Sequence, residues 1–155
     1  MLPADIRETI ARAVQDLYRQ NQADRKPPDD PAMVEWDQLR EDLKESNRQQ
    51  ADHFLELLRR IGCLAHPVTD REIVIMAFTE DEIEFMAELE HERWNQERTK
   101  EGWTLGPERD LEKKISPHLV PWSKLPDDIR EYDRETVRGI PQLLAQIGLE
   151  IRRAT

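Results

Sequence analysis

Trp103 is the residue whose type and position most clearly suggest chemistry. It directly follows Gly102, at the expected end of a helix, and it begins an irregular stretch of sequence. From such a position a flat indole ring can stack on a purine, and this stacking contributes about 1–3 kcal/mol per base in nucleic-acid complexes. Anchoring the loop to the core is an equally good interpretation of this tryptophan.

Basic side chains could supply the phosphate contacts that such a ligand would need. An arginine holds a phosphate through its bidentate fork, and a lysine through a point charge. The candidates are Arg48, Arg109, Lys114 and Arg134. The alternative for each is an ordinary ion pair, or an arginine bond to a carbonyl group, and for Lys113 a solvated face is favoured.

Three further candidate ligand contacts have competing structural interpretations. Trp94 shares a helical face with apolar residues, so burial in the core is its more common role. His91 lacks a cysteine partner and a second histidine four residues later, which disfavours metal binding and favours a hydrogen bond that holds the glycine–tryptophan loop. Asp110 is expected to cap or orient the same loop.

The sequence contains none of the common catalytic motifs. GxGxxG, GxxxxGK[ST], HExxH and GxSxG are all absent, and no nucleophile has an identifiable base. We therefore expect a protein that is not an enzyme and needs neither a cofactor nor a metal. A small hydrolase ranks last among the functions considered.

The elements that must position these residues follow from the spacing of apolar side chains. Helical periodicity predicts four helices, over residues 3–23, 37–61, 79–100 and 126–147. Pro27 and Pro28 end the first pattern, and Thr79 with Glu82 has the spacing of a capping box. Glycines mark the later helix ends, at Gly62, Gly102 and Gly148. Gly139 and Pro141 should bend or break the last helix, and residues 101–125 should be mostly irregular loop.

The bulk composition favours a helical protein. Charged residues make up 36% of the 155 residues and hydrophobic residues 37%, which suits amphipathic helices with charged outer faces. Five glycines and ten prolines are unlike the composition of a β-sandwich. We therefore predict an all-α fold with long ordered loops in a single domain.

Charge and cysteine content limit the partners and the setting. A net charge of -10 disfavours nucleic acid and anionic lipid, although residues 91–138 are close to neutral and would repel an anionic ligand least. The single cysteine, Cys63, excludes an intramolecular disulfide and favours a reducing, cytoplasmic setting. The sequence has no apolar run of about eighteen residues and no leader, so we expect no direct membrane contact.

Residues 33–62 and 119–148 are two copies of one sequence unit. Aligned without gaps at an offset of 86, they share ten identities in thirty positions, whereas chance would give roughly two. The shared pairs include Trp36 with Trp122 and Arg48 with Arg134. Because packing does not require a shared arginine, this pairing indicates more than a common helical period.

The duplication predicts two pseudo-symmetric two-helix units. A weaker match places Gln15 opposite His91 and Tyr18 opposite Trp94. The predicted organisation is therefore a degenerate copy over residues 1–62, a connector over 63–79 and a full repeat over 80–151. Two such units should pack around a pseudo-twofold axis, and the groove between them could hold a ligand. Only the second copy has the glycine–tryptophan loop, which predicts one principal site marked by Trp103.

Residues 88–151 resemble the ryanodine receptor repeat, or RyR domain, along their whole length. The matching positions are His91, Trp94, Gly102, Trp103, Gly106, Asp110, Lys114, Pro117, residues 119–122, Leu125, Asp133, Arg134 and Gly148. Residues 33–62 are similar to a partial second copy, with Asn47 and Arg48 at the positions of Asp133 and Arg134. Ser116 stands where the family often has a histidine, and His118 lies close by.

The resemblance implies a regulatory role. In the channels these repeats form tandem pairs on the cytosolic side, and a pair is implied to bind adenine nucleotide and regulatory small molecules between its halves. We therefore expect a non-catalytic module that senses an adenine nucleotide or a nucleotide-derived signal. The alternative is a protein-interaction or assembly module of a larger channel-like or effector protein. A homo-oligomer and attachment to further domains both remain open.

Overall fold

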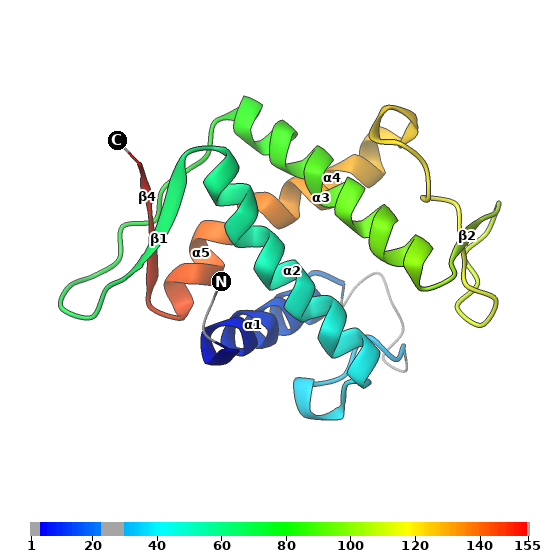
Figure 1. Ribbon diagram of the computed structural model, residues 1–155, viewed down its shortest axis with the longest axis horizontal. Coiled ribbons are helices and arrows are strands. Elements are labelled where there is room, and N and C mark those ends of the chain that lie inside the picture. Colours follow the sequence, from blue (N-terminus) through cyan, green and yellow to red (C-terminus); the bar gives the residue numbers. More distant parts are fainter. Residues whose placement is uncertain (1–3, 23–29, 155) are drawn as a thin grey trace. The chain divides into compact units, whose positions relative to one another are not determined.

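The computed structural model describes residues 4–22 and 30–154, which form two compact units (Figure 1). Unit 1 combines the described residues up to 77 with those from 140 onward, and unit 2 spans residues 78–139. The expected first helix boundaries, Pro3 and Ala23, and the two prolines at 27 and 28 lie outside the described residues. Among the described helices, none has the length and apolar character needed to cross a bilayer.

Unit 1 is built on two packed helices. Its elements are α1 (Ala4–Gln22), the 3₁₀ turn η1 (Trp36–Gln38), α2 (Glu41–Arg60), β1 (Cys63–Pro67), α5 (Ile140–Gln146) and β4 (Leu149–Arg153). Helix α1 packs against α2 and α5, while β1 contacts α2 and β4 contacts α5. The apolar stripes of the helices supply fully buried side chains, among them Ile10, Phe54, Leu57, Leu58 and Leu144.

Strands β1 and β4 form an antiparallel pair that joins distant parts of the sequence. Ala65 lies opposite Ile151, so the pairing is centred on residues that are themselves 86 positions apart. Each strand follows a glycine in the left-handed region, with φ 76° at Gly62 and 84° at Gly148. This conformation is inexpensive for glycine and lets the chain leave the helix end in a new direction.

The all-α prediction is therefore wrong. The fold is mostly helical, but the described residues also contain the β1–β4 pair and a short parallel pair in unit 2. The expected two-helix units are incomplete for the same reason, because both aligned segments continue into a strand. A five-residue strand has little periodicity of its own, and its partner is too distant in sequence to be recognised from local pattern.

Unit 2 contains the loop that the sequence marked as functional. Its elements are α3 (Glu80–Lys100), β2 (Thr104–Leu105), β3 (Ile115–Ser116), the 3₁₀ turn η2 (Trp122–Lys124) and α4 (Asp127–Arg138), and α3 packs against α4. The capping box is confirmed, because Glu82 N donates to Thr79 Oγ1 and Thr79 N donates to the Glu82 carboxylate. The predicted break in the last helix is confirmed at Gly139, which separates α4 from α5.

Candidate functional site

Each unit buries a tryptophan at the start of its 3₁₀ turn and covers the ring with cations. In unit 1, side chains lie 5.5–5.6 Å from the Trp36 ring centroid, namely those of Arg12, Lys44 and Arg48. In unit 2, Arg130 and Arg134 lie 5.3 and 5.8 Å from the Trp122 ring centroid. These are distances at which a cation is attracted to the negative face of an aromatic ring.

The paired arginines Arg48 and Arg134 are engaged with carboxylates. Arg48 binds the acidic side chains of Glu8, Glu41 and Glu45. Arg134 binds those of Glu84, Asp127 and Glu131. The hydrogen bonds to Glu8 and Glu84 are the largest cause that raises the pKa of the respective arginine above its ordinary value. A phosphate at either arginine would have to compete with these carboxylates.

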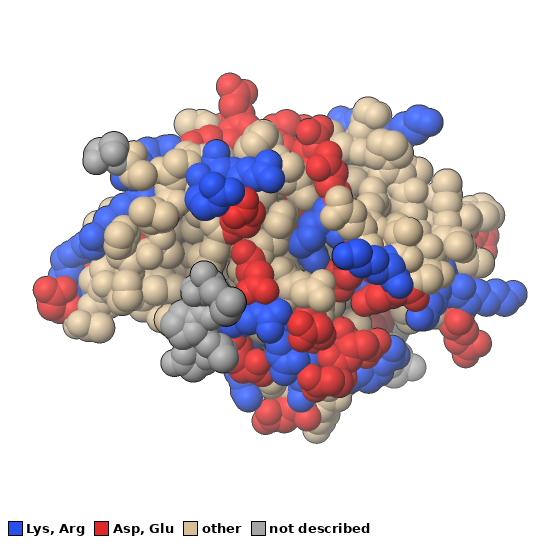
Figure 2. Space-filling view, in the orientation of Figure 1, with Lys and Arg blue, Asp and Glu red and all other residues tan. Residues whose placement is uncertain are grey.

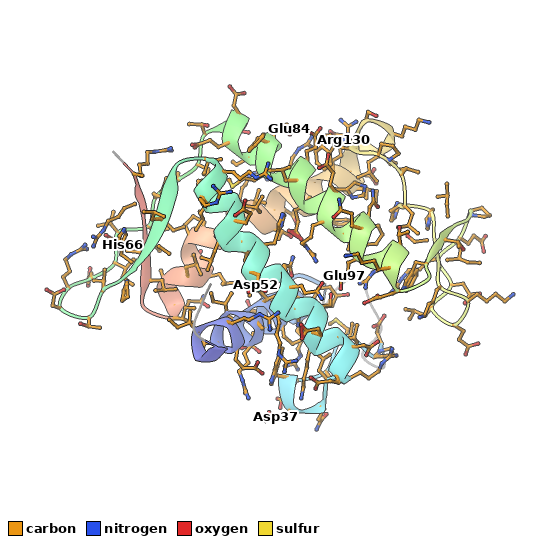
Figure 3. The ribbon with its side chains drawn as sticks, in the orientation of Figure 1. Asp37, Asp52, His66, Glu84, Glu97 and Arg130 are labelled. Carbon is orange, nitrogen blue, oxygen red and sulfur yellow. The ribbon has the colours of Figure 1, made fainter. Side chains whose placement is uncertain are left out.

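Figure 2 shows acidic and basic side chains next to one another over the middle and lower part of the face drawn, in keeping with these local ion pairs. In Figure 3, Glu84 on α3 lies near Arg130 on α4. The hydrogen bond from Arg134 is the main cause that lowers the pKa of Glu84. The charge of Arg134, a hydrogen bond with the Trp122 side chain and the charge of Arg130 lower this pKa further. The bonds from Arg134 and Trp122 to Glu84 thus help to hold α4 and η2 against α3.

His91 is buried and bonds the main chain in front of η2. Its Nε2 lies 2.7 Å from the Val120 carbonyl oxygen, and Asn95 Nδ2 donates to the same oxygen at 2.9 Å. The expected hydrogen bond is therefore made, although to residue 120 rather than to the glycine–tryptophan loop. Burial is the main cause that lowers the pKa of His91.

Trp94, Arg98 and Trp103 form a half-buried stack at the end of α3, which we call the tryptophan platform. The Arg98 guanidinium carbon lies 5.7 Å from the Trp94 ring centroid and 5.6 Å from that of Trp103. The His91 ring is also stacked on Trp94, with its centroid 5.7 Å away and an interplanar angle of 21°. Trp94 and Trp103 therefore meet around one cation that the sequence analysis did not select.

The backbone places Trp103 over Arg98. Gly102 has φ 92°, Gly102 N donates to Thr99 O, and Trp103 N donates to Arg98 O at 2.9 Å. These two bonds are those of the Schellman motif, which often sets the residue after the glycine against the preceding helical turn. The i, i+4 spacing of Trp94 and Arg98 could have revealed the contact from sequence.

The loop after Trp103 is held by backbone bonds and by two of the predicted residues. Asp110 and Ile115 exchange backbone hydrogen bonds, and the Asp110 carboxylate accepts from Lys113 N at 3.1 Å. The loop-orienting role of Asp110 is therefore confirmed. Lys114 has φ 56°, and its Nζ donates to Glu101 O at 2.8 Å, where a positive charge suits a helix C-terminus.

Polar side chains of α3 line a shallow depression of about 370 Å³, namely Asn95, Gln96, Thr99 and Lys100. Asn95 Oδ1 is buried and has no hydrogen-bond partner among the described residues. Arg109, in contrast, is exposed on the loop. Within unit 2, Trp94, Trp103 and Lys114 thus lie around the end of α3, whereas Arg134 lies beside Trp122 and Glu84, and Arg48 belongs to unit 1.

A family model described as the RyR domain matches residues 64–153. The match begins in β1, ends in β4 and covers more than half of the chain, so the chain belongs to the RyR domain family. The resemblance seen in the sequence is thereby confirmed. A regulatory or interaction module is the class of protein that this membership indicates, and the family is in general non-enzymatic.

Proposed function

We propose that the chain is a non-catalytic sensing module that binds an adenine nucleotide or a nucleotide-derived signal at the tryptophan platform. The observation that carries this proposal is the placement of Arg98 against both Trp94 and Trp103. Aromatic rings and a guanidinium group in one stack offer both a surface for a base and a charge for a phosphate.

The platform assigns a role to each neighbouring residue. Trp103 stacks on the base from the loop side, and Arg98 meets phosphate. Among the described residues, Glu101 at 3.1 Å and Glu97 at 3.9 Å both contact the same guanidinium nitrogen of Arg98, which leaves the other nitrogens for a bidentate contact. Lys100 lines the adjoining depression, and Lys114 neutralises the carbonyl end of α3. Without Lys114, that end of the helix would repel a phosphate.

A thermal-shift panel tests the proposal. The full chain is heated with ATP, ADP, ADP-ribose or cyclic nucleotides at millimolar concentration. A ligand that binds only the folded state at about 100 times its Kd stabilises by about 2.7 kcal/mol, which is about 5–10 °C for a protein of this size. If no compound in the panel moves the melting temperature, the nucleotide proposal is wrong.

Substitutions at the platform then locate the site. Trp103→Ala should weaken nucleotide binding by about 5- to 150-fold, the range that corresponds to the loss of one stacked base. Trp103→Phe keeps a ring and should retain most of the affinity. Lys113→Ala is the matched control on the same loop, because Lys113 contributes its backbone N–H to Asp110 and not its side chain. Equal affinity of Trp103→Ala and the original chain would place the ligand elsewhere.

A second candidate function is protein interaction or assembly, and exposed apolar residues in unit 1 favour it. The side chains of Leu64, Val74 and Ile75 are 49%, 69% and 54% exposed. Exposed apolar groups are a feature of contact surfaces when they gather on one face, and Val74 and Ile75 are neighbours in the sequence. Light scattering over a range of concentrations should then show association, and Val74→Ser with Ile75→Ser should abolish it. A strictly monomeric chain would leave this function without support.

A further inference from the structure

The contact of His91 with the Val120 carbonyl oxygen determines which of its ring nitrogens carries a proton. A carbonyl oxygen can only accept a hydrogen bond, so the 2.7 Å contact with Val120 O requires a proton on Nε2. In a neutral imidazole the other nitrogen, Nδ1, is then an acceptor. Nδ1 faces Asp133 Oδ2 at 3.7 Å. An ionised Asp133 would therefore set two acceptors against each other with no proton between them.

Asp133 lies in surroundings that disfavour its ionised form. Its side chain is only 21% exposed, and no hydrogen bond from the described residues reaches its carboxylate. Burial, followed by the negative charge of Glu90, raises the pKa of Asp133 to about 7, despite the opposing charge of Arg93. Arg93 is itself held by Glu90 and Glu97, at 2.7 Å from each, and so it is shared among several acids.

Unit 1 contains the same arrangement built from amides. Gln15 Nε2 donates to Val34 O at 2.7 Å and to Ala32 O at 2.9 Å, which fixes its Oε1 as the remaining acceptor. Asn47 Nδ2 donates to that oxygen at 3.0 Å. Val34 and Asn47 stand 86 positions before Val120 and Asp133. Where unit 1 has a permanent N–H donor on Asn47, unit 2 has a carboxyl group that can donate only when protonated.

We propose that His91 and Asp133 share one exchangeable proton, which resides on the Asp133 carboxyl and makes unit 2 responsive to pH. The Asp133 Oδ2 atom lies 3.7 Å from His91 Nδ1, slightly beyond hydrogen-bond distance, and a small approach of the protonated carboxyl would let it donate as Asn47 donates to Gln15 at 3.0 Å. Loss of the proton leaves a buried carboxylate that faces an acceptor and lies near Glu90. This site binds a proton and does not depend on the proposed nucleotide.

The other charged groups around the pair act in opposing directions. On α3, Glu90 raises the pKa of Asp133 and Arg93 lowers it. Glu92 and Glu90 also raise the pKa of His91 and so favour a charged ring. From the segment before η2, the charge of His118 disfavours a proton on His91, and burial of the ring is the larger cause of its lowered pKa. Burial is the largest cause at both groups, and because it disfavours both an ionised Asp133 and a charged His91, it favours the proton on the carboxyl group over the imidazole.

Nuclear magnetic resonance of the full chain tests the proposal directly. The ¹³C shift of the Asp133 carboxyl carbon and the ¹⁵N shifts of His91 are followed from pH 5.5 to 8.5 and assigned with Asp133→Asn. The carboxyl carbon should titrate with a midpoint near 7, and His91 should remain the neutral Nε2–H tautomer. A carboxyl carbon that is already ionised at pH 5.5, or an imidazolium ring at pH 6, would overturn the assignment.

Stability measurements add a second, independent readout. Asn at position 133 supplies the N–H donor permanently, so Asp133→Asn should unfold at a higher temperature than the original chain at pH 8.5. The difference in melting temperature should shrink by about 4–8 °C at pH 5.5, because only the original folded chain gains a proton at Asp133. A difference that stays constant over this range would contradict the proposal.

The chain supplies matched control variants. His91→Gln combined with Asp133→Asn reproduces the amide arrangement of Gln15 and Asn47 and should remove the pH dependence. Asn47→Asp performs the opposite exchange in unit 1 and should destabilise the protein more at pH 8.5 than at pH 5.5. If Asn47→Asp lowers the stability equally at pH 5.5 and pH 8.5, then an acceptor opposite the carboxyl group, here Gln15 Oε1, does not make that group sensitive to pH.

Discussion

Cation–aromatic contacts are the recurring device at the scale of single residues. Arg48 and Arg134 each lie over a buried tryptophan and are held there by carboxylates from the helix before and from their own helix. The duplication therefore preserves a structural contact at these two positions. Arg98, the arginine that we propose contacts the ligand, lies outside the aligned segments and has no counterpart among their identical pairs.

Arg134→Ala should lower the free energy of unfolding by about 1–2 kcal/mol, because it removes one cation–π contact and the bonds to Glu84 and Asp127. Arg134→Lys is the matched control, since it keeps the charge but not the planar fork, and it should recover only part of the loss. Urea unfolding at low and high salt measures both variants. A full recovery by lysine would mean that charge alone is required.

Two glycines near the tryptophan platform make distinct residue-scale predictions. At Gly106 an added Cβ would collide with the Ile115 side chain, so Gly106→Ala should distort the loop. At Gly102 an added Cβ has open space but meets φ 92°, so Gly102→Ala should cost about 1–2 kcal/mol through backbone strain alone. Thermal unfolding and the fluorescence of Trp103 report the two effects. Wild-type fluorescence in Gly106→Ala would show that the collision is relieved elsewhere.

At the scale of elements, a side-chain clamp holds the segment after β1 to β4. The Glu150 side chain is 6% exposed and accepts bonds from Arg71, Arg152 and the Val74 backbone N–H. The bond from Arg71 is the largest cause that holds the pKa of Glu150 far below its ordinary value. Residues 71–74, which have no regular secondary structure, are thereby tied to a strand.

Glu150→Gln should lower the melting temperature at pH 7, because it removes the charge on which these bonds depend. A carboxyl group with a lowered pKa in the folded state stabilises above its unfolded pKa, and this contribution is lost as the pH falls below about 4.5. The difference between the variant and the original chain should therefore shrink between pH 5 and pH 3. Glu72→Gln is the matched control at an exposed neighbouring position, and it should leave the melting temperature unchanged at neutral and at acidic pH.

At the scale of the whole molecule, the family match and the folding unit have different boundaries. The match covers residues 64–153, yet unit 1 takes much of its core from α1 and α2, which lie before residue 64. Helix α5 packs against α1, and β1 against α2. A chain confined to the matched residues would expose these apolar faces.

A fragment of residues 64–153 should therefore unfold without a sharp transition and should bind a hydrophobic dye, whereas the full chain should unfold cooperatively. Calorimetry and dye fluorescence of the fragment and of the full chain provide the comparison. Mixing the fragment with residues 1–63 should restore the transition in part. A cooperative transition of the fragment alone would show that unit 2 and the remaining elements suffice for a core.

The sequence by itself determined the features that depend on neighbours along the chain. Apolar periodicity located the helices, Thr79 and Glu82 defined the capping box, and Gly139 placed the break between α4 and α5. The alignment of Trp36 with Trp122 identified positions that make matching contacts, and the motif around Trp103 identified the RyR domain family. Each of these signals is either a local motif of a few residues or a match between two copies of one sequence unit.

Only the tertiary structure decided what depends on contacts between distant segments. Five-residue strands carry little local signal, so the pairing of β1 with β4 could not be read from either one. The position of Arg98 between two tryptophan rings depends on the helix end at Gly102. The proton on Asp133 depends on burial and on the fixed orientation of His91, because a carboxyl group in water would simply ionise.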